Sequence, residues 1–511
     1  MSGVEAVAPD PLRRTIVVIG AGYGGLRLFS ESLDLCVSAR MADAVRFVFV
    51  DERSLAEYGR GVAWASDQNT NMRANMHSPE ITIDPVTRDT VANILGTSYD
   101  RVATASELFE QRTKVGEILA TQFQATLQRA KKFHVPFIAV EDQAVDIERK
   151  GITYEVTLKS GRKLLGDYVV LALGHIPSTA YSSLFNSPNY VRNPWTGIKS
   201  VKALTKKGSI AVLGLGPTAV DTIIKLRDEG AADLRAYSRT GSMQYPRPIP
   251  RPFDPKVVTQ SNIARIGADM GGLRLRVLMG MVVSEFIIQE VDWRPFVKAV
   301  ENSTEHPATS LSKGYAECRQ HSDWFGLAAS LTSSIPIAWR YLVDEDRDAF
   351  RQFHRRISNV LYGMAPSHAL RMLTELEDKK LVVVGGLVDV NFDERKKRFL
   401  ISYDEKAGVQ TDEVDVVIDC TGFGTDLTRS ETPLISNLLA RKVLRPHAFG
   451  GAEVDFETGQ VGEVAGRSME IYCLAGSLNI GTRFVTNGLG HVASSAQRTA
   501  KAIHSRLGAT N

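Results

Sequence analysis

Cysteine is scarce in this sequence, and its placement excludes dithiol chemistry. The 511 residues contain four cysteines: Cys36, Cys318, Cys420 and Cys473. At this spacing they form neither a disulfide framework nor a CxxC redox pair. No cluster of His, Cys, Asp or Glu has the spacing of metal ligands either, so no metal site is predicted.

Strong net charge and long apolar runs are also missing. The 61 basic and 58 acidic residues give a net charge of +3, which is no electrostatic signature of nucleic acid or anionic membrane. No apolar run approaches the roughly 20 residues of a membrane span. The opening MSGVEAVAPDPLRR lacks the apolar core of a signal peptide. We therefore expect a cytoplasmic protein with small-molecule partners, no nucleic-acid partner and no membrane span.

Glycines stand where a nucleotide-binding turn needs them. The apolar run 16–19 leads into Gly20-Ala21-Gly22-Tyr23-Gly24-Gly25 and an amphipathic stretch, which predicts strand, tight turn and helix. In such a unit the first glycine allows the turn, the second admits a pyrophosphate and the third lets the helix pack on the strand. The next apolar run ends at Asp51, whose carboxylate can accept hydrogen bonds from a ribose. A dinucleotide site is predicted here, with a plain structural turn as the alternative.

The same pattern returns near residue 210. The run 209–213 precedes Gly214-Leu215-Gly216-Pro217-Thr218-Ala219, in which Ala219 takes the place of the third glycine. The following strand ends in Ser238-Arg239 rather than in an acid. A guanidinium there can pair with a 2′-phosphate, so this second site is predicted to prefer NADPH. A solvated loop arginine is the alternative.

Each glycine motif is followed by a similar β-rich stretch, which indicates an internal repeat of roughly 200 residues. Both stretches close with an apolar strand and a small-residue turn, VVLALG at 169–174 and VVIDCTG at 416–422, which ends at Gly422. Hairpin turns are predicted at Gly151 and Gly161. One FAD site and one nicotinamide site explain this duplication most simply.

These motifs resemble those of the two-dinucleotide-binding-domain flavoproteins, a class B flavin monooxygenase-like architecture in which the first site holds FAD and the second NADPH. A narrower resemblance lies in GRGVAWASDQNTNMRANMHSPE (59–80) and SELFEQRTKVGEIL (106–119). They are similar to stretches of an FAD-NAD(P)-binding family that includes FAD-dependent urate hydroxylases and aspartate N-monooxygenases. The resemblance implies that Asn75, Met76 and Arg112 lie at the flavin cofactor.

Few catalytic side chains are expected, because in this reading the flavin performs the difficult step as a C4a-peroxide. Asn75 and His77 are candidates to face the flavin or the substrate, with a solvated loop as the alternative. Gly488-Leu489-Gly490 opens a C-terminal helix near His491, and the start of that helix is expected to face the flavin. For His491 a catalytic role and a packing role stay open.

The fold class predicted is α/β, with two Rossmann-like domains, β-meanders and a mainly helical insertion. The boundaries expected are 1–198 and 426–511 for the FAD-binding domain, 199–254 and 376–425 for the NADPH-binding domain, and 255–375 for the insertion. The insertion follows a proline-dense linker and is expected to select the substrate. His321, His354, Arg355 and Arg356 are candidates there for reading an anionic substrate, with surface charges or core histidines as the alternative.

The function predicted is an FAD-dependent, NADPH-consuming monooxygenase that uses O2 to hydroxylate a small polar, nitrogen-containing metabolite. N-hydroxylation of an amino acid or amine is favoured, and hydroxylation of a purine-like ring comes second. The alternatives are an FAD-dependent oxidoreductase that passes electrons from NADPH to a quinone or protein, and a nucleotide-binding sensor without turnover.

Overall fold

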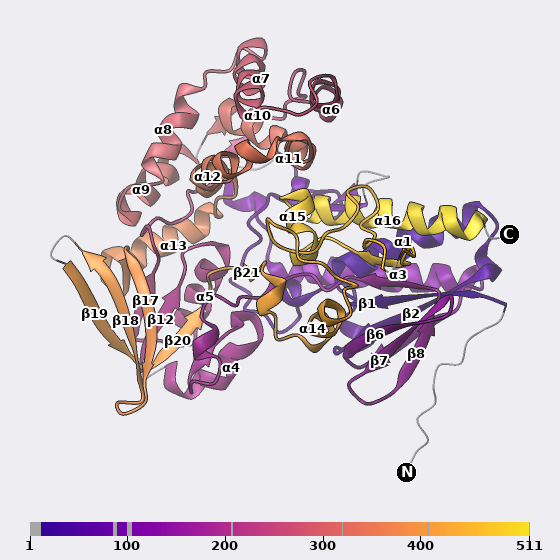
Figure 1. The fold of residues 1–511 in the computed structure, drawn as a ribbon. Coiled ribbons are helices and arrows are strands. Elements are labelled where there is room, and N and C mark those ends of the chain that lie inside the picture. Colours follow the sequence, from indigo (N-terminus) through magenta and orange to yellow (C-terminus); the bar gives the residue numbers. More distant parts are fainter. Residues whose placement is uncertain are drawn as a thin grey trace.

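The computed structural model describes residues 12–84, 89–99, 105–205, 208–318, 320–405, 408–464 and 466–509. The opening segment MSGVEAVAPDPLRR, for which the sequence predicts no signal peptide, lies mostly outside the described residues. Two α/β units lie side by side in Figure 1, and a group of helices lies above them. No helix in the described ranges is long and apolar enough to cross a membrane.

The first sheet is fully parallel, with the strand order β22-β9-β1-β2-β5. Its strands are β1 (Arg14–Ile19), β2 (Val45–Asp51), β5 (Phe137–Glu141), β9 (Tyr168–Leu171) and β22 (Ile471–Cys473). Helices α1 (Tyr23–Ser38), α3 (Arg112–Lys132) and α16 (Leu489–Ala509) cover one face. Nearly every side chain of β1 and β2 is buried, because a sheet covered on both faces exposes neither.

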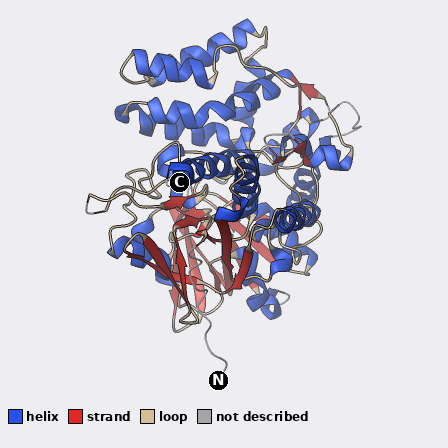
Figure 2. Cartoon of the chain, turned by 90° about the vertical axis from the view of Figure 1, so that its right-hand side faces the viewer, coloured by secondary structure: helices blue, strands red, loops and turns tan. Residues whose placement is uncertain are grey.

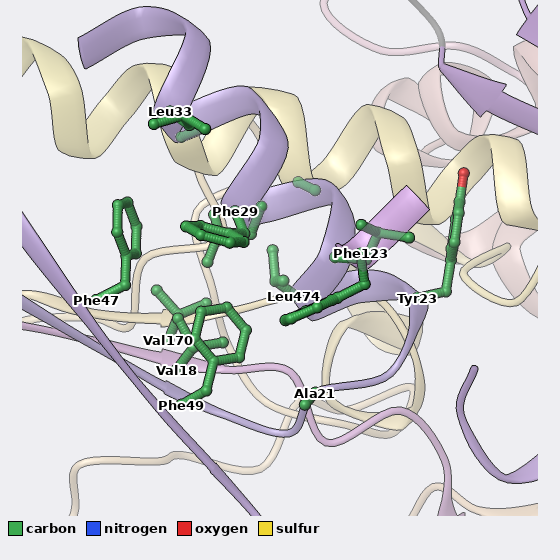
Figure 3. Close-up of a cluster of buried hydrophobic side chains, with 14 of the residues drawn as sticks. Val18, Ala21, Tyr23, Phe29, Leu33, Phe47, Phe49, Phe123, Val170 and Leu474 are labelled. Atoms are coloured by element: carbon green, nitrogen blue, oxygen red, sulfur yellow. The ribbon is translucent and has the colours of Figure 1, made fainter. Parts of the chain in front are cut away.

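The core under α1 is rich in aromatic rings (Figure 3). Phe29 of α1 lies 5.0 Å from Phe47 and 5.6 Å from Phe49, both of β2, in edge-to-face contacts between ring centroids. Phe123 of α3 closes the group at 5.7 Å from Phe49. These rings hold α1 against the sheet and so fix the glycine turn from which α1 begins.

The second sheet repeats this plan with the order β11-β20-β12-β13-β16, again fully parallel. Its strands are β11 (Tyr190–Val191), β12 (Ser209–Leu213), β13 (Asp233–Tyr237), β16 (Leu381–Val384) and β20 (Val416–Asp419). Helices α4 (Pro194–Thr205), α5 (Pro217–Asp228) and α13 (Pro366–Glu377) pack against it.

A three-stranded antiparallel meander accompanies each sheet. The first consists of β6 (Ala144–Lys150), β7 (Thr153–Leu158) and β8 (Lys163–Gly166), and the second of β17 (Leu387–Asp393), β18 (Arg398–Glu405) and β19 (Gly408–Val414). Gly151 and Gly161 occupy the first meander's turns with positive φ, as expected for hairpins. The predicted repeat and fold class are confirmed.

The chain passes between the two units at their edge strands. β11 pairs with β20 in the second sheet although it precedes the predicted boundary at residue 198, and that boundary falls inside α4. A strand of two residues has too little apolar pattern to be recognised in the sequence. The C-terminal segment returns to the first unit with α14 (Pro433–Ala440), β22, α15 (Ile480–Arg483) and α16.

The predicted insertion is helical, and its helices stand above the sheets in Figures 1 and 2. They are α6 (Gln260–Asp269), α7 (Leu275–Ile288), α8 (Arg294–Asn302), α9 (Pro307–Glu317), α10 (Asp323–Leu331), α11 (Ile335–Tyr341) and α12 (Asp344–Leu361). The remaining elements are the short helix α2 (Val91–Leu95) and the paired short strands β3 (Thr82–Asp84) with β4 (Asp89–Thr90), β10 (Ile176–Pro177) with β21 (Phe423–Gly424), and β14 (Ile249–Pro250) with β15 (His321–Ser322).

Candidate functional site

The first glycine turn packs closely against the protein and leaves the start of α1 without a side-chain cap from the described residues. Gly20 has φ +102°, and a Cβ on it would lie 2.4 Å from the carbonyl oxygen of Ala172. Gly22 is the N-cap of α1, and a Cβ on it would lie 3.3 Å from the Cα of Gly61. No described side chain caps this helix, and its first turn holds no acid. The N–H groups at the start of α1 therefore stay available to an anion.

The other glycines of this turn serve packing. A Cβ on Gly25 would lie 2.6 Å from the carbonyl oxygen of Gly20, so this position must stay small for α1 to pack on β1. Gly24 faces Val492 of α16 and Leu474 at ordinary contact distances. The start of α16 is thus adjacent to the start of α1.

Asp51, the predicted ribose acceptor, is occupied by protein donors. Its carboxylate accepts from the backbone N–H of Ala21 at 2.7 Å and from Arg53 through the backbone N–H, Nε and Nη2 at 2.8–3.0 Å. These four donors use the four acceptor positions of a carboxylate. Although burial opposes it, the hydrogen bonds and charge of Arg53 hold the pKa of Asp51 below its ordinary value. Asp51 stabilises the glycine turn, and its contact with a ribose stays a prediction.

The second glycine turn has the same geometry as the first. Gly214 has φ +103°, and a Cβ on it would lie 2.5 Å from the carbonyl oxygen of Cys420. Gly216 is the N-cap of α5 and faces open space. Thr218 is half-buried at the start of the helix, and Ala219 is fully buried against β12. Two copies of one glycine turn, each before a helix that no described side chain caps, are therefore present.

Arg239 stands exposed just beyond β13, beside this second turn. The nearby Arg235 pairs with Asp412 at 2.9 Å. Ser238 accepts a hydrogen bond from the backbone N–H of Gly241 at 2.9 Å, which shapes the loop. The position of Arg239 fits the predicted contact with a 2′-phosphate, which stays a prediction.

The turns that close the two repeats meet each other. β10 pairs with β21, and His175 stacks on Phe423 with ring centroids 4.1 Å apart. Gly422, directly before this pair, has φ +118° and open space where a Cβ would stand. The turns that close the two repeats, one from each unit, are thereby joined at one junction.

Arg112 lies at the interface of the two units. Its Nε and Nη2 bind the carboxylate of Asp221 of α5 at 2.9 and 2.8 Å, and both residues are buried. The rings of Trp64 and Trp195 flank the guanidinium at 5.1 and 5.4 Å. The family resemblance assigns Arg112 to the flavin cofactor, whereas in the structure its charge is paired across the interface.

His77 lies in a second buried cluster. Its Nδ1 is 3.2 Å from the Oε1 of Glu80, and both oxygens of Glu80 accept from Nη2 of Arg247 at 3.0 and 2.9 Å. The ring of His77 is fully buried beside Phe109. Burial lowers the pKa of His77 against the attraction of Glu80, which favours a neutral imidazole.

The neighbours of His77 are placed differently. The carbonyl oxygen of Asn75 accepts from Nη1 of Arg247 at 2.8 Å, and Met76 packs against the core under α1. Sequence reasoning missed Arg247 and Glu80 because they are 167 positions apart. The position of Arg247 between Pro246 and Pro248 is the local sequence feature that distinguishes this arginine.

The start of α16 carries a buried positive cluster. Gly488 and Leu489 open the helix, and a Cβ on Gly488 would meet the ring of His491 at 3.2 Å. Burial and the charge of Arg498 lower the pKa of Arg483 to about 9. Burial and these two arginines also lower the pKa of His491. Nε and Nη1 of Arg483 have no hydrogen-bond partner among the described residues.

The candidates in the insertion do not form one site. His354 lines an apolar cavity between the helices, whereas Arg355 and Arg356 are exposed. His321 is exposed in the short strand β15. Within the described ranges no group of His, Cys, Asp and Glu is arranged to hold a metal ion.

Comparison with known proteins supports the architecture. Residues 17–176 match the model of an FAD-NAD(P)-binding family. A search of curated proteins finds no match to this sequence.

Solved structures match over nearly the whole chain at low identity. The L-lysine 6-monooxygenase from Pseudomonas syringae aligns with a TM-score of 0.59 and 13% identity over 97% of this chain and 100% of that one. The reduced ornithine hydroxylase from Pseudomonas aeruginosa aligns with a TM-score of 0.55 and 12% identity, over 97% of this chain and 100% of that one. The ornithine N-hydroxylase from Kutzneria sp. 744, with reduced FAD, NADP+ and L-ornithine, aligns with a TM-score of 0.55 and 13% identity. The alignment covers 97% of this chain and 99% of that one. The chain therefore has the fold of these three enzymes, and its residues 17–176 match an FAD-NAD(P)-binding family.

Proposed function

We propose that this protein is an FAD-dependent, NADPH-consuming monooxygenase that hydroxylates the nitrogen of an amine or amino acid. The observation that carries the proposal is the pair of equivalent glycine turns, Gly20 and Gly214 with φ +102° and +103°, joined through β10 and β21. This arrangement supports two dinucleotides bound next to one junction. The fold shared with the lysine and ornithine hydroxylases supports the reaction class.

The residues at the first turn fit FAD. The backbone N–H of Gly59 donates to the carbonyl oxygen of Ala21 at 2.7 Å, which brings residues 59–61 against the turn. Nε and Nη1 of Arg60 and Nη1 of Arg53 are buried there without a hydrogen-bond partner among the described residues. Since a buried guanidinium group needs acceptors, these atoms suit the pyrophosphate of a dinucleotide.

The positive cluster at α16 fits the redox role. Arg483, Arg498 and the start of the helix present positive charge, and no carboxylate within ion-pair distance of either arginine is described. Such a cluster stabilises negative charge that develops on a neighbouring group. When bound, FAD supplies acceptance of hydride from NADPH and activation of O2.

The overall reaction proposed is balanced. NADPH, a proton, O2 and the amine give NADP+, water and the hydroxylamine. One oxygen atom enters the new N–O bond and the other leaves as water, with the two electrons supplied by NADPH. The protein's tasks are to orient the nitrogen and to exclude bulk water.

Thiol–disulfide reduction, a reaction possible for related folds, lacks support in this chain. All four cysteines are buried and unpaired. Burial raises the pKa of each thiol, that of Cys36 to about 11 and that of Cys473 to about 12. A reactive cysteine needs a thiolate near neutral pH, so these four suit packing.

The test is NADPH oxidation by the FAD-loaded protein with a panel of amines and amino acids under 18O2. The proposal expects an amine that speeds NADPH consumption and gains one labelled oxygen atom. Reduction of a quinone without oxygen incorporation would replace the monooxygenase by the acceptor-reducing alternative. A protein that takes up no FAD would overturn both.

A further inference from the structure

The helical insertion contains an apolar cavity of about 100 Å³. It lies among helices α6, α7, α8, α10, α11 and α12, and its wall also includes residues just outside them. The carbon surface comes from Val258, Ile263, Leu278, Met279, Val282, Phe286, Phe296, Ala328, Leu331, Ile335, Ala338, Phe350, Phe353, Ile357 and Leu361. Its size approaches that of the cavity of roughly 150 Å³ that holds benzene in an engineered protein core.

The wall contains three polar side chains, Thr332, Ser334 and His354, and each has a hydrogen-bond partner in the protein. The hydroxyl of Thr332 donates to the carbonyl oxygen of Ala329 at 2.6 Å, and that of Ser334 donates to the carbonyl oxygen of Val258 at 3.0 Å. Nε2 of His354 lies 3.3 Å from the hydroxyl of Tyr362. A water molecule needs two to four polar partners, which this wall does not supply, so the cavity favours a carbon group over water.

His354 keeps the wall uncharged. Burial lowers its pKa to about 4, so the imidazole is neutral at physiological pH. The charged groups on the neighbouring turns of α12, such as Arg351 and Arg355, are exposed. A charged part of a ligand therefore finds no counter-charge in the cavity.

The cavity lies close to the start of α16. Phe350 and His354, both in its wall, contact Phe484 with ring centroids 5.2 and 4.8 Å apart. Phe484 directly follows α15 and precedes Gly488, where α16 opens. Phe484 therefore connects the cavity wall to the short segment that leads into the start of α16.

We propose that this cavity holds an apolar carbon group of the substrate, so that the enzyme acts on amines with an unbranched or branched alkyl part rather than on diamines charged at both ends. This inference rests on the proposed function for the identity of the reacting nitrogen. It adds the recognition of the remainder of the molecule.

The first arm of the test measures KM for primary amines from ethylamine to hexylamine with FAD-loaded protein and NADPH. Each added methylene is expected to lower KM about fourfold until the cavity is full. A KM independent of chain length, or a better substrate in 1,5-diaminopentane than in pentylamine, would overturn the inference while leaving the monooxygenase intact.

The second arm fills the cavity. Ala328→Leu in α10 and Ala338→Leu in α11 each add carbons to the wall, and Ala268→Leu makes the same change at an exposed position of α6. Both filled variants are expected to lose the chain-length dependence, with KM for hexylamine raised at least tenfold more than KM for ethylamine. The control is expected to behave as wild type. Filled variants that fold with an unchanged melting temperature and retain the dependence refute the cavity's role.

The third arm needs no turnover. Xenon binding to the FAD-loaded protein, followed by 129Xe NMR, is expected in wild type and Ala268→Leu and absent in Ala328→Leu. Xenon binding without oxidation of any amine would retain the apolar site and reject the proposed function. Wild-type protein that binds no xenon would reject the site itself.

Discussion

Removing the guanidinium of Arg112 tests whether this residue joins the two units or serves the cofactor. Nε and Nη2 of Arg112 both contact Oδ2 of Asp221, at 2.9 and 2.8 Å, and both side chains are almost fully buried. Loss of one partner of such a pair leaves a buried charge and costs about 3–5 kcal/mol. Since whole proteins are stable by about 5–15 kcal/mol, Arg112→Met is expected to remove a large part of the stability.

The double variant separates the two interpretations. In Arg112→Met/Asp221→Leu no charge is left unpaired, and replacement of a buried pair by apolar groups is often close to neutral. We therefore expect the double variant to recover to within about 1 kcal/mol of wild type, a coupling of at least about 2 kcal/mol. If Arg112 acts mainly through the cofactor, the second substitution restores nothing.

The assay is urea unfolding at saturating FAD, followed by tryptophan fluorescence, because Trp64 and Trp195 flank the guanidinium. Saturating FAD keeps the contribution of ligand binding comparable among variants. FAD content after gel filtration is measured in parallel. A double variant as unstable as Arg112→Met, or one that folds fully but loses FAD, would refute the interface role.

Three further predictions follow from single residues. Arg239→Ala is expected to raise KM for NADPH at least tenfold more than KM for NADH, and equal effects would remove the 2′-phosphate contact. Gly214→Ala is expected to abolish NADPH binding in titrations while the FAD content is retained, because its Cβ would lie 2.5 Å from a carbonyl oxygen. The control Gly280→Ala has open space at its Cβ and should leave NADPH binding and FAD content unchanged. Burial opposes ionisation of Glu80, but the charge of Arg247 and the hydrogen bonds of Arg247 and His77 hold its pKa at about 2, below its value in the unfolded chain. Its contribution of about 3 kcal/mol is therefore complete above pH about 4.5 and lost as the pH falls towards 2, so unfolding free energies of Glu80→Gln and wild type should converge only in acid.

The architecture was predictable because its requirements are local in the sequence. Gly20 and Gly214 stand where a side chain would collide with the backbone of a neighbouring strand, so the fold imposes the residue type. The strands before these glycines are almost entirely apolar and buried, so the sequence identifies them as strands of a covered sheet. Both features recur in each repeat, and the repetition itself strengthens the prediction.

The contacts that organise the candidate site were not predictable in this way. Arg112 and Asp221 are 109 positions apart, and nothing near either residue indicates its partner. Asp51 follows its strand as a ribose acceptor does, yet its acceptor positions are filled by Ala21 and Arg53. A sequence motif supplies the chemical group, whereas the pairing of that group depends on which segments the fold brings together.

The apolar cavity illustrates the same limit for the substrate. Leu278 and Phe286 lie on the buried face of α7, with the spacing that places apolar residues on one face of a helix. The pattern is identical whether such a face meets another helix or an open space, because both require carbon groups. The size and position of the cavity depend on the packing of six helices, so the pattern of any one helix does not indicate the substrate.

The interface contacts also constrain how the two cofactors meet. The carboxylate of Asp228, at the end of α5, accepts from Asn71 at 2.8 Å, and Nη1 of Arg247 donates to the carbonyl oxygen of Asn75. A large rotation between the units must break these contacts together with the pair of Arg112 and Asp221. A rotated state that leaves either charge buried and unpaired costs about 3–5 kcal/mol, which limits that state to below about 1% of molecules. Hydride transfer is therefore expected to occur with the units in the arrangement described, by movement of the nicotinamide rather than of a whole domain.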